Sequence, residues 1–158
     1  MSKRENVMNN TRNEQNPLGD MLLVIYEDYV HYHAHARKNF SYAKMTFADI
    51  IWKQSKKVWD GFVSVEALEH VKAGLIKKPV YEHFIPISIG VEKILLTDQP
   101  MALDDFTLVI SQICRVRKVS REENYKLKKF YANLTLEEAI EQHEQIYAAC
   151  GIVKSDCP

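Results

Sequence analysis

The sequence lacks most of the short motifs by which small catalytic domains are recognised. The chain holds three cysteines, Cys114, Cys150 and Cys157, and no two of them form a Cys-x-x-Cys pair. An odd number of cysteines without such a pair argues against a disulfide framework or a zinc ribbon, and favours a reducing, cytoplasmic location. No Gly-x-Gly-x-x-Gly, Walker or Gly-x-Ser-x-Gly pattern is present, which counts against a nucleotide-cofactor enzyme and a serine hydrolase.

Long apolar runs and an excess of charge are missing as well. The longest apolar run near the start, residues 21–26, is far too short to cross a bilayer, and the polar residues 2–16 do not resemble a signal peptide. We therefore expect no membrane partner. The 21 basic and 21 acidic side chains cancel, which argues against a protein coated in positive charge.

A chain of 158 residues is long enough for one domain with its own core. Residues 1–17 are rich in Asn, Arg and Glu and have no apolar period, so we expect a flexible N-terminal arm. We expect the remaining residues, 18–158, to form a single domain.

Apolar residues at helical spacing predict helices through much of this domain. In the first part, residues 18–75, they predict helices over 18–35 and 46–59, and a third that begins at Ser64 and ends near Gly74. Later helices are predicted over 103–113, 121–130 and 135–151. Ser120 and Thr135 are the expected N-caps of the last two, and Glu123 would complete a capping box with Ser120.

Two short segments are typical of strands. Residues 79–86 are β-leaning and run into Pro86, and residues 115–119 alternate charge with valine. The order from residue 80 to residue 130 is therefore strand, intervening segment, strand and helix.

This order resembles the HNH nuclease family. In that family an acid-His pair, followed by an apolar residue and a proline, ends the first strand, as in Glu82-His83-Phe84-Ile85-Pro86 here. A later helix carries an Asn or His, often in a setting such as Glu-Asn-x-x-Leu-Lys, which matches residues 123–128 around Asn124. The resemblance covers residues 80–130 and implies a helix-rich α+β fold: a ββα-metal core with N-terminal helices and a C-terminal helix.

Two features depart from the family pattern. Asn124 follows His83 by 41 positions, which is longer than the usual family core, so residues 91–113 are interpreted as a helical insertion. The family's middle Asn, which orients the histidine, would fall near Cys114.

The resemblance implies a metal-dependent endonuclease that hydrolyses DNA phosphodiester bonds. His83 would be the general base, because the pKa of a histidine lies near neutrality. Glu82 and Asn124 would hold Mg²⁺ or Mn²⁺, since carboxylate and amide oxygens are the hard ligands that these ions prefer. One such site cuts one strand per encounter, so cutting both strands would require a homodimer or a second visit.

Basic residues gather around the proposed metal ligand. Between residues 112 and 130 there are seven basic side chains against two acidic ones, and phosphate contacts require such a stripe. The predicted DNA contacts are Arg115, Arg117, Lys118, Arg121, Lys126, Lys128 and Lys129. A solvated helix face with alternating strand charges would produce the same pattern.

Two alternatives remain open from the residues alone. The first is a non-catalytic DNA- or protein-binding module with a degenerate HNH-like core. The second is a zinc protein, because His31 and His35 share a helix face at i, i+4 spacing, although no third ligand is near them in sequence. Histidines near a helix C-terminus are also favoured by the helix dipole alone.

Several other residues are expected to be structural or solvent-exposed. We expect the aromatic side chains of Trp52, Trp59, Phe62 and Tyr81 to pack in the core or at its boundary. His70 and His143 lie in polar helical settings and are expected to be exposed.

Overall fold

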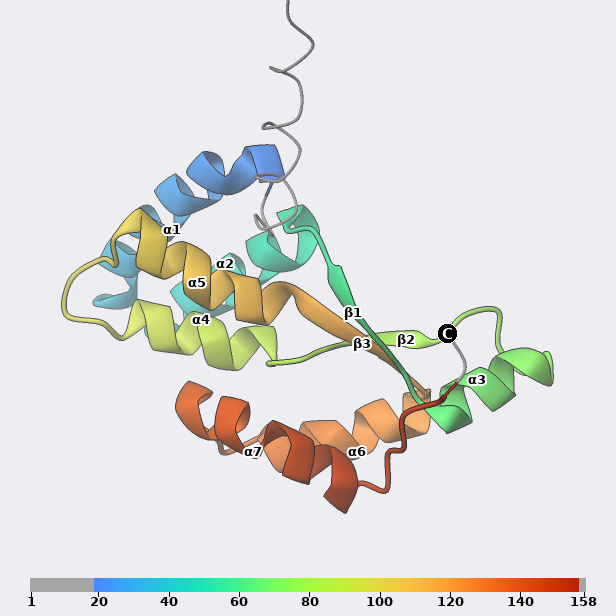
Figure 1. The fold of residues 1–158 in the computed structure, drawn as a ribbon. Helices are drawn as coiled ribbons and strands as arrows, with labels where there is room; N and C mark the ends of the chain where they lie inside the picture. The colour runs from blue at the N-terminus through green and yellow to red at the C-terminus, as the bar shows by residue number, and fades with distance from the viewer. Residues whose placement is uncertain (1–18, 157–158) are drawn as a thin grey trace, which may run out of the picture.

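The computed structural model describes residues 19–156 and has an α+β fold rich in helix (Figure 1). Across this range the chain forms seven α-helices and one three-stranded mixed sheet. The predicted arm, residues 1–17, and Cys157 lie outside the described residues. The helices are α1 (Leu22–Ala36), α2 (Phe40–Gln54), α3 (Val65–Lys72), α4 (Ile87–Leu95), α5 (Leu103–Cys114), α6 (Arg121–Tyr131) and α7 (Leu136–Ala149), and the strands are β1 (Val58–Val63), β2 (Val80–His83) and β3 (Arg115–Val119).

Side-chain caps fix the starts of three helices where the sequence predicts them. The Ser64 side chain accepts a hydrogen bond from the Ala67 N–H at the start of α3. Ser120 and Glu123 form the predicted capping box of α6, and Thr135 forms another at the start of α7. Each cap satisfies backbone N–H groups that a helix start would leave without partners.

The helix predicted over residues 46–59 is wrong at both ends. It begins earlier, at Phe40, because the Asn39 side chain caps it by accepting from the Tyr42 N–H. It ends at Gln54, and the Ser55 hydroxyl then donates to the Ile51 carbonyl. Val58 and Trp59, whose spacing from the helix suggested that it continued, belong instead to β1.

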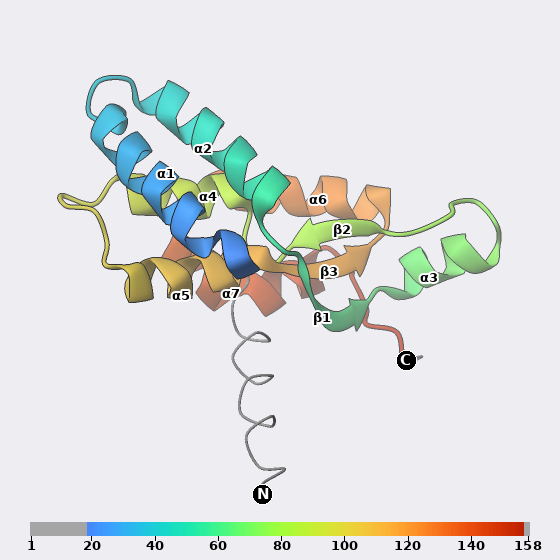
Figure 2. The same ribbon diagram turned by 90° about the horizontal axis from the view of Figure 1, so that it is seen from above.

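Strand β3 is the centre of the sheet, in the order β1-β3-β2. It pairs parallel with β1 and antiparallel with β2, and Glu82 and His83 lie opposite Arg117 and Val116. Strand β2 is therefore an edge strand. Helices α6 and α7 cover one face of the sheet, and α1, α2, α4 and α5 gather at its end (Figures 1 and 2).

Two clusters of buried apolar side chains hold the fold together. One lies among α1, α2, α4 and α5 and includes Tyr29, Phe47 and Phe106. The other lies between the sheet and helices α6 and α7 and includes Leu127 and Tyr147. The segment predicted as a helical insertion contributes to the first cluster through α4 and α5. In residues 19–156 no helix has both the length and the apolar character that a membrane span requires.

Candidate functional site

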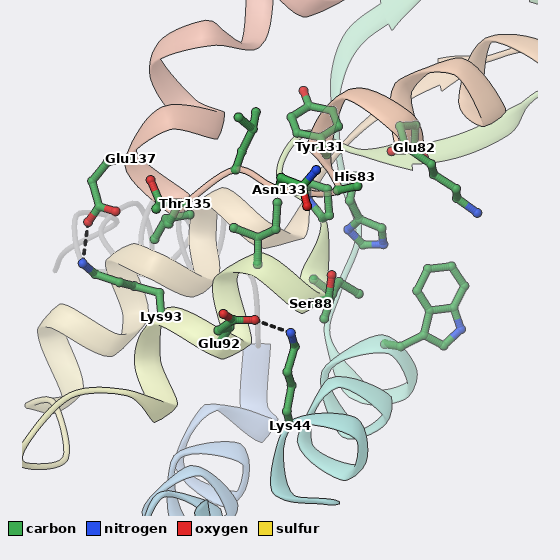
Figure 3. A pocket seen from close by; sticks show the side chains of 18 of the residues that line it. Lys44, Glu82, His83, Ser88, Glu92, Lys93, Tyr131, Asn133, Thr135 and Glu137 are labelled. Atoms are coloured by element: carbon green, nitrogen blue, oxygen red, sulfur yellow. Dashed lines mark hydrogen bonds and ion pairs between the residues drawn. The ribbon is translucent and has the colours of Figure 1, made fainter. Parts of the chain in front are cut away.

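A cavity of about 740 Å³ opens where the edge strand β2 meets α4, α6 and the start of α7 (Figure 3). Its wall includes Glu82, His83 and Asn124, the three residues for which the HNH resemblance predicts catalysis and metal binding. Figure 3 shows Glu82 and His83 at one end of the cavity and the ion pair of Lys93 with Glu137 (2.6 Å) at the other. Glu82 and His83 are neighbours on a strand and point to opposite faces, and the edge position of β2 lets both line one cavity.

The ring of His83 is held in one tautomer. Its Nδ1–H donates to the backbone carbonyl of Ile113 over 2.7 Å, which leaves the lone pair on Nε2. Nε2 is buried and has no hydrogen-bond partner among the described residues. Burial lowers the pKa of His83 below its usual value, and the charge of Lys57 lowers it further. The hydrogen bond to Ile113 acts in the opposite direction and raises the pKa, but by less. His83 therefore carries an available proton acceptor at neutral pH.

The carboxyl group of Glu82 is buried without a direct partner. Glu82 is 7% exposed and forms no hydrogen bond or ion pair with any residue in 19–156. Burial raises its pKa to about 7, and the charge of Lys128 opposes that shift. A buried carboxylate is costly unless a cation compensates it, so this position is suited to binding one.

Asn124 supplies a second oxygen donor. It lies in the first turns of α6, and its N–H donates to Ser120 in the capped helix start. Its side-chain Oδ1 is buried and has no hydrogen-bond partner among the described residues. A carboxylate oxygen and an amide oxygen without partners are a donor set that fits Mg²⁺ or Mn²⁺.

A backbone carbonyl next to Cys114 orients the ring of His83. Cys114 is buried, and burial raises the pKa of its thiol to about 11, so it is a neutral, inert side chain. The preceding residue, Ile113, provides the carbonyl that accepts the hydrogen bond from the His83 Nδ1–H. No sequence signal could have shown this, because every residue type has a backbone carbonyl.

The predicted DNA-contacting residues have different environments. Arg117 is buried, and its guanidinium pairs with Asp60 and Glu144, each over 2.8 Å, and lies over the ring of Tyr147. Its charge is therefore already compensated by these two carboxylates. Arg115 is half-buried with its guanidinium over Phe84.

The other basic side chains are more accessible. Lys118 is half-buried on β3, and four exposed residues follow on α6, namely Arg121, Lys126, Lys128 and Lys129. Among the seven predicted contacts, Lys128 is the one that lines the cavity. An ion pair of Lys44 with Glu92 also lines it and was not predicted, since the two residues lie on different helices.

Three aromatic side chains are more exposed than the sequence indicated. Phe62 is buried as predicted, but Trp52, Trp59 and Tyr81 are 49%, 44% and 39% exposed. Trp52 lines the cavity, and its ring centroid lies 5.3 Å from that of His83.

Neither His143 nor His70 is exposed as predicted. His143 is buried, and its Nδ1 is hydrogen-bonded to the Tyr131 hydroxyl over 2.8 Å. Burial, with a contribution from Arg117, lowers the pKa of His143 to about 4. His70 is half-buried, and its ring nitrogen and the carboxylates of Glu66 and Glu122 lie within 4.8 Å of one another.

The group of Glu66, His70 and Glu122 could hold a metal ion, although it does not line the cavity. The predicted zinc pair lies elsewhere. His31 and His35 do lie side by side on α1, with ring centroids 4.5 Å apart, but residues 19–156 offer them no third ligand.

No protein-family model, no curated protein and no solved structure matches this chain.

Proposed function

We propose that this protein is a metal-dependent endonuclease that hydrolyses DNA phosphodiester bonds at an HNH-like ββα site. One observation carries the proposal: two buried polar atoms without hydrogen-bonding partners, the His83 Nε2 and the Asn124 Oδ1, line the same cavity. The buried residue Glu82 lines it too, and its carboxyl forms no ion pair within residues 19–156. Buried polar atoms are normally satisfied, so two of them beside a carboxyl in one cavity suggest that their partners are a metal ion and a substrate.

The order of the elements supports the same proposal. The antiparallel pair β2 and β3 is followed directly by α6, which contacts β2. Glu82 lies on β2, the first strand of this pair, and Asn124 lies on α6, as the HNH resemblance implies. Helices α4 and α5 occupy the connection between the strands.

The residues suggest a division of roles. Glu82 and Asn124 would hold the Mg²⁺ or Mn²⁺, which supplies charge stabilisation for the leaving oxygen. His83 accepts a proton from the attacking water at Nε2, the water oxygen forms a new bond to phosphorus, and the bond to the leaving sugar oxygen breaks. Lys128, exposed at the cavity wall, pairs with a phosphate oxygen.

A plasmid-nicking assay tests this function. Supercoiled plasmid is incubated with the full chain in Mg²⁺, Mn²⁺ or EDTA, and His83→Ala is compared with wild type. We expect nicking that depends on the metal and falls at least about 100-fold in the variant, because a general base contributes that much or more. His35→Ala, which changes an exposed histidine, is the matched control and should nick like wild type.

Two results would count against the enzyme. Unchanged nicking by His83→Ala would assign the activity to another group or a contaminant. No nicking by the wild type with either metal would favour the non-catalytic binding module.

A further inference from the structure

A row of three exposed rings lies on the face of the sheet away from α6 and α7 and on the neighbouring end of α2. In Figure 2 this face is toward the viewer, with no helix in front of β2 and β3. Trp59 lies on β1 and Tyr81 on β2, while Trp52 lies near the end of α2 beside His83. Each of the three is more than a third exposed. Large aromatic side chains are normally buried, so three exposed rings, two of which line the cavity, suggest a binding surface.

Lysines without acidic partners accompany these rings. The Lys118 Nζ lies 3.8 Å from the ring centroid of Trp59 and 5.8 Å from that of Tyr81. The Lys57 Nζ lies 4.0 Å from the ring of Trp52. Within residues 19–156 neither lysine forms an ion pair with a carboxylate. The row therefore combines flat apolar faces with uncompensated positive charge.

The row leads to the candidate catalytic histidine. Tyr81 precedes His83 by two positions on β2, so the two side chains share a face of the sheet. Trp52 and Tyr81 line the cavity together with His83. A ligand lying along the rings would therefore pass next to the His83 Nε2.

We propose that this row is a binding platform for single-stranded DNA, whose unpaired bases stack on Trp52, Trp59 and Tyr81. The proposal rests on the proposed nuclease function and names its substrate as an unpaired strand or an unpaired segment of a duplex. In the complex the bases take the place of Lys57 and Lys118 over the rings. The two displaced lysines then pair with the phosphates of the strand.

The chemistry of the surface selects this ligand. A base in a duplex is stacked on its neighbours and has no free face to offer, whereas an unpaired base stacks readily on an aromatic side chain. Positive charge beside each ring complements a phosphate backbone.

Intrinsic fluorescence tests the proposal directly, because Trp52 and Trp59 are the two tryptophans of the whole chain. The full chain in EDTA, where no turnover occurs, is titrated with a twelve-nucleotide oligo-dT. We expect the strand to quench tryptophan emission, and each single variant, Trp52→Phe and Trp59→Phe, to lose part of the quenching. A blunt duplex of the same length should quench far less.

Affinity from anisotropy of a labelled oligonucleotide gives the second readout. We expect Trp52→Ala to weaken binding at least about fivefold, the loss of one stacked base. The Trp59 Nε1–H donates to the Phe62 carbonyl, so Trp59→Ala would also remove a hydrogen bond of the fold. The affinity measurement therefore uses Tyr81→Ala and Lys118→Gln in place of Trp59→Ala. Lys118→Gln should also reduce the slope of log affinity against log salt by about 0.7, the loss of one phosphate contact on a single strand. Lys72→Gln, an exposed lysine of α3, should change neither quantity.

Three outcomes would overturn the platform: binding without quenching, equal quenching by the duplex, or unchanged affinity in both Trp52→Ala and Tyr81→Ala. The nicking assay keeps this failure apart from failure of the enzyme. A protein that nicks plasmid but does not quench with oligo-dT retains the proposed function and loses the platform.

Discussion

Glu82 and Arg117 occupy directly opposed positions on β2 and β3, yet the Arg117 guanidinium binds Asp60 and Glu144 and not Glu82. A cross-strand acid and arginine normally attract each other. Here two other carboxylates engage the arginine, and the Glu82 carboxyl is left buried beside the cavity. The fold thus keeps an acid available at a cost in stability.

Replacing Glu82 with Gln should stabilise the metal-free protein at alkaline pH. The pKa of Glu82 is raised from 4.5 to about 7 in the folded state, so the folded protein holds a proton that the unfolded chain releases. Stability therefore falls as the pH rises from 4.5 to 7, by about 3 kcal/mol, and the amide avoids this loss. Urea denaturation in EDTA at pH 8 should show the gain.

Adding Mn²⁺ should reverse the order of the two proteins. Wild type should be stabilised by the ion and Glu82→Gln should not, because a ligand that binds the folded state raises its stability. Equal stabilisation of both proteins would place the metal elsewhere, with Glu66, His70 and Glu122 as the next candidates.

Removing each partner of Arg117 should have unequal effects. Asp60→Ala should destabilise the protein by about 3 kcal/mol. The Asp60 side chain is only 12% exposed, and its loss leaves the buried Arg117 guanidinium without one of its two compensating carboxylates. Glu144 is 75% exposed, so Glu144→Ala should cost less than about 1 kcal/mol. Denaturant midpoints of the two variants provide the comparison, and equal losses would contradict the role given to burial.

Gly90→Ala should disturb the support of His83. A Cβ at Gly90 would meet the Ile113 side chain at 2.2 Å, and Ile113 is fully buried. The expected loss is about 1–3 kcal/mol from overpacking, in spite of the better helix propensity of alanine. Ile113→Val removes the nearest methyl group and should cost less in the Gly90→Ala background than in wild type. Additive effects of the two changes would mean that the contact does not matter.

His143 should make the protein sensitive to acid. Its pKa is about 4 in the folded protein, against 6.5 ordinarily, so below pH 6.5 the unfolded chain takes up a proton that the folded one excludes. Stability should fall between pH 6.5 and 4 by up to about 1.4 kcal/mol per unit. In His143→Gln the fall in stability per pH unit should be smaller, even if the variant is less stable than wild type at neutral pH. The exposed His35→Gln should keep the wild-type slope, and an unchanged slope in His143→Gln would assign it to other groups.

Local signals in the sequence were sufficient for the elements that depend on local chemistry. The capped starts of α3, α6 and α7 follow from the hydroxyl side chains of Ser64, Ser120 and Thr135. Strand β1 was missed because it depends on pairing with β3, more than fifty residues away in sequence. Its first residues also continue a helical spacing, and tertiary pairing overrides such a pattern.

Only the part of the candidate site that depends on the types of its side chains could be predicted from the sequence. Glu82, His83 and Asn124 could be named from a resemblance, and they line one cavity. The carbonyl of Ile113 and the burial of Arg117 follow from packing between distant segments, which no short motif encodes.

The central position of β3 also sets the order in which the protein can assemble. Strands β1 and β2 each pair with β3 and not with each other, and β3 is the last of the strands that residues 19–156 form. During synthesis neither early strand has a ladder partner until residue 119 has emerged, and Asn124 follows still later. A chain stalled before β3 holds Glu82 and His83 on an unpaired segment. The cavity that we propose as a nuclease site therefore forms only after β3 and the start of α6 have been synthesised.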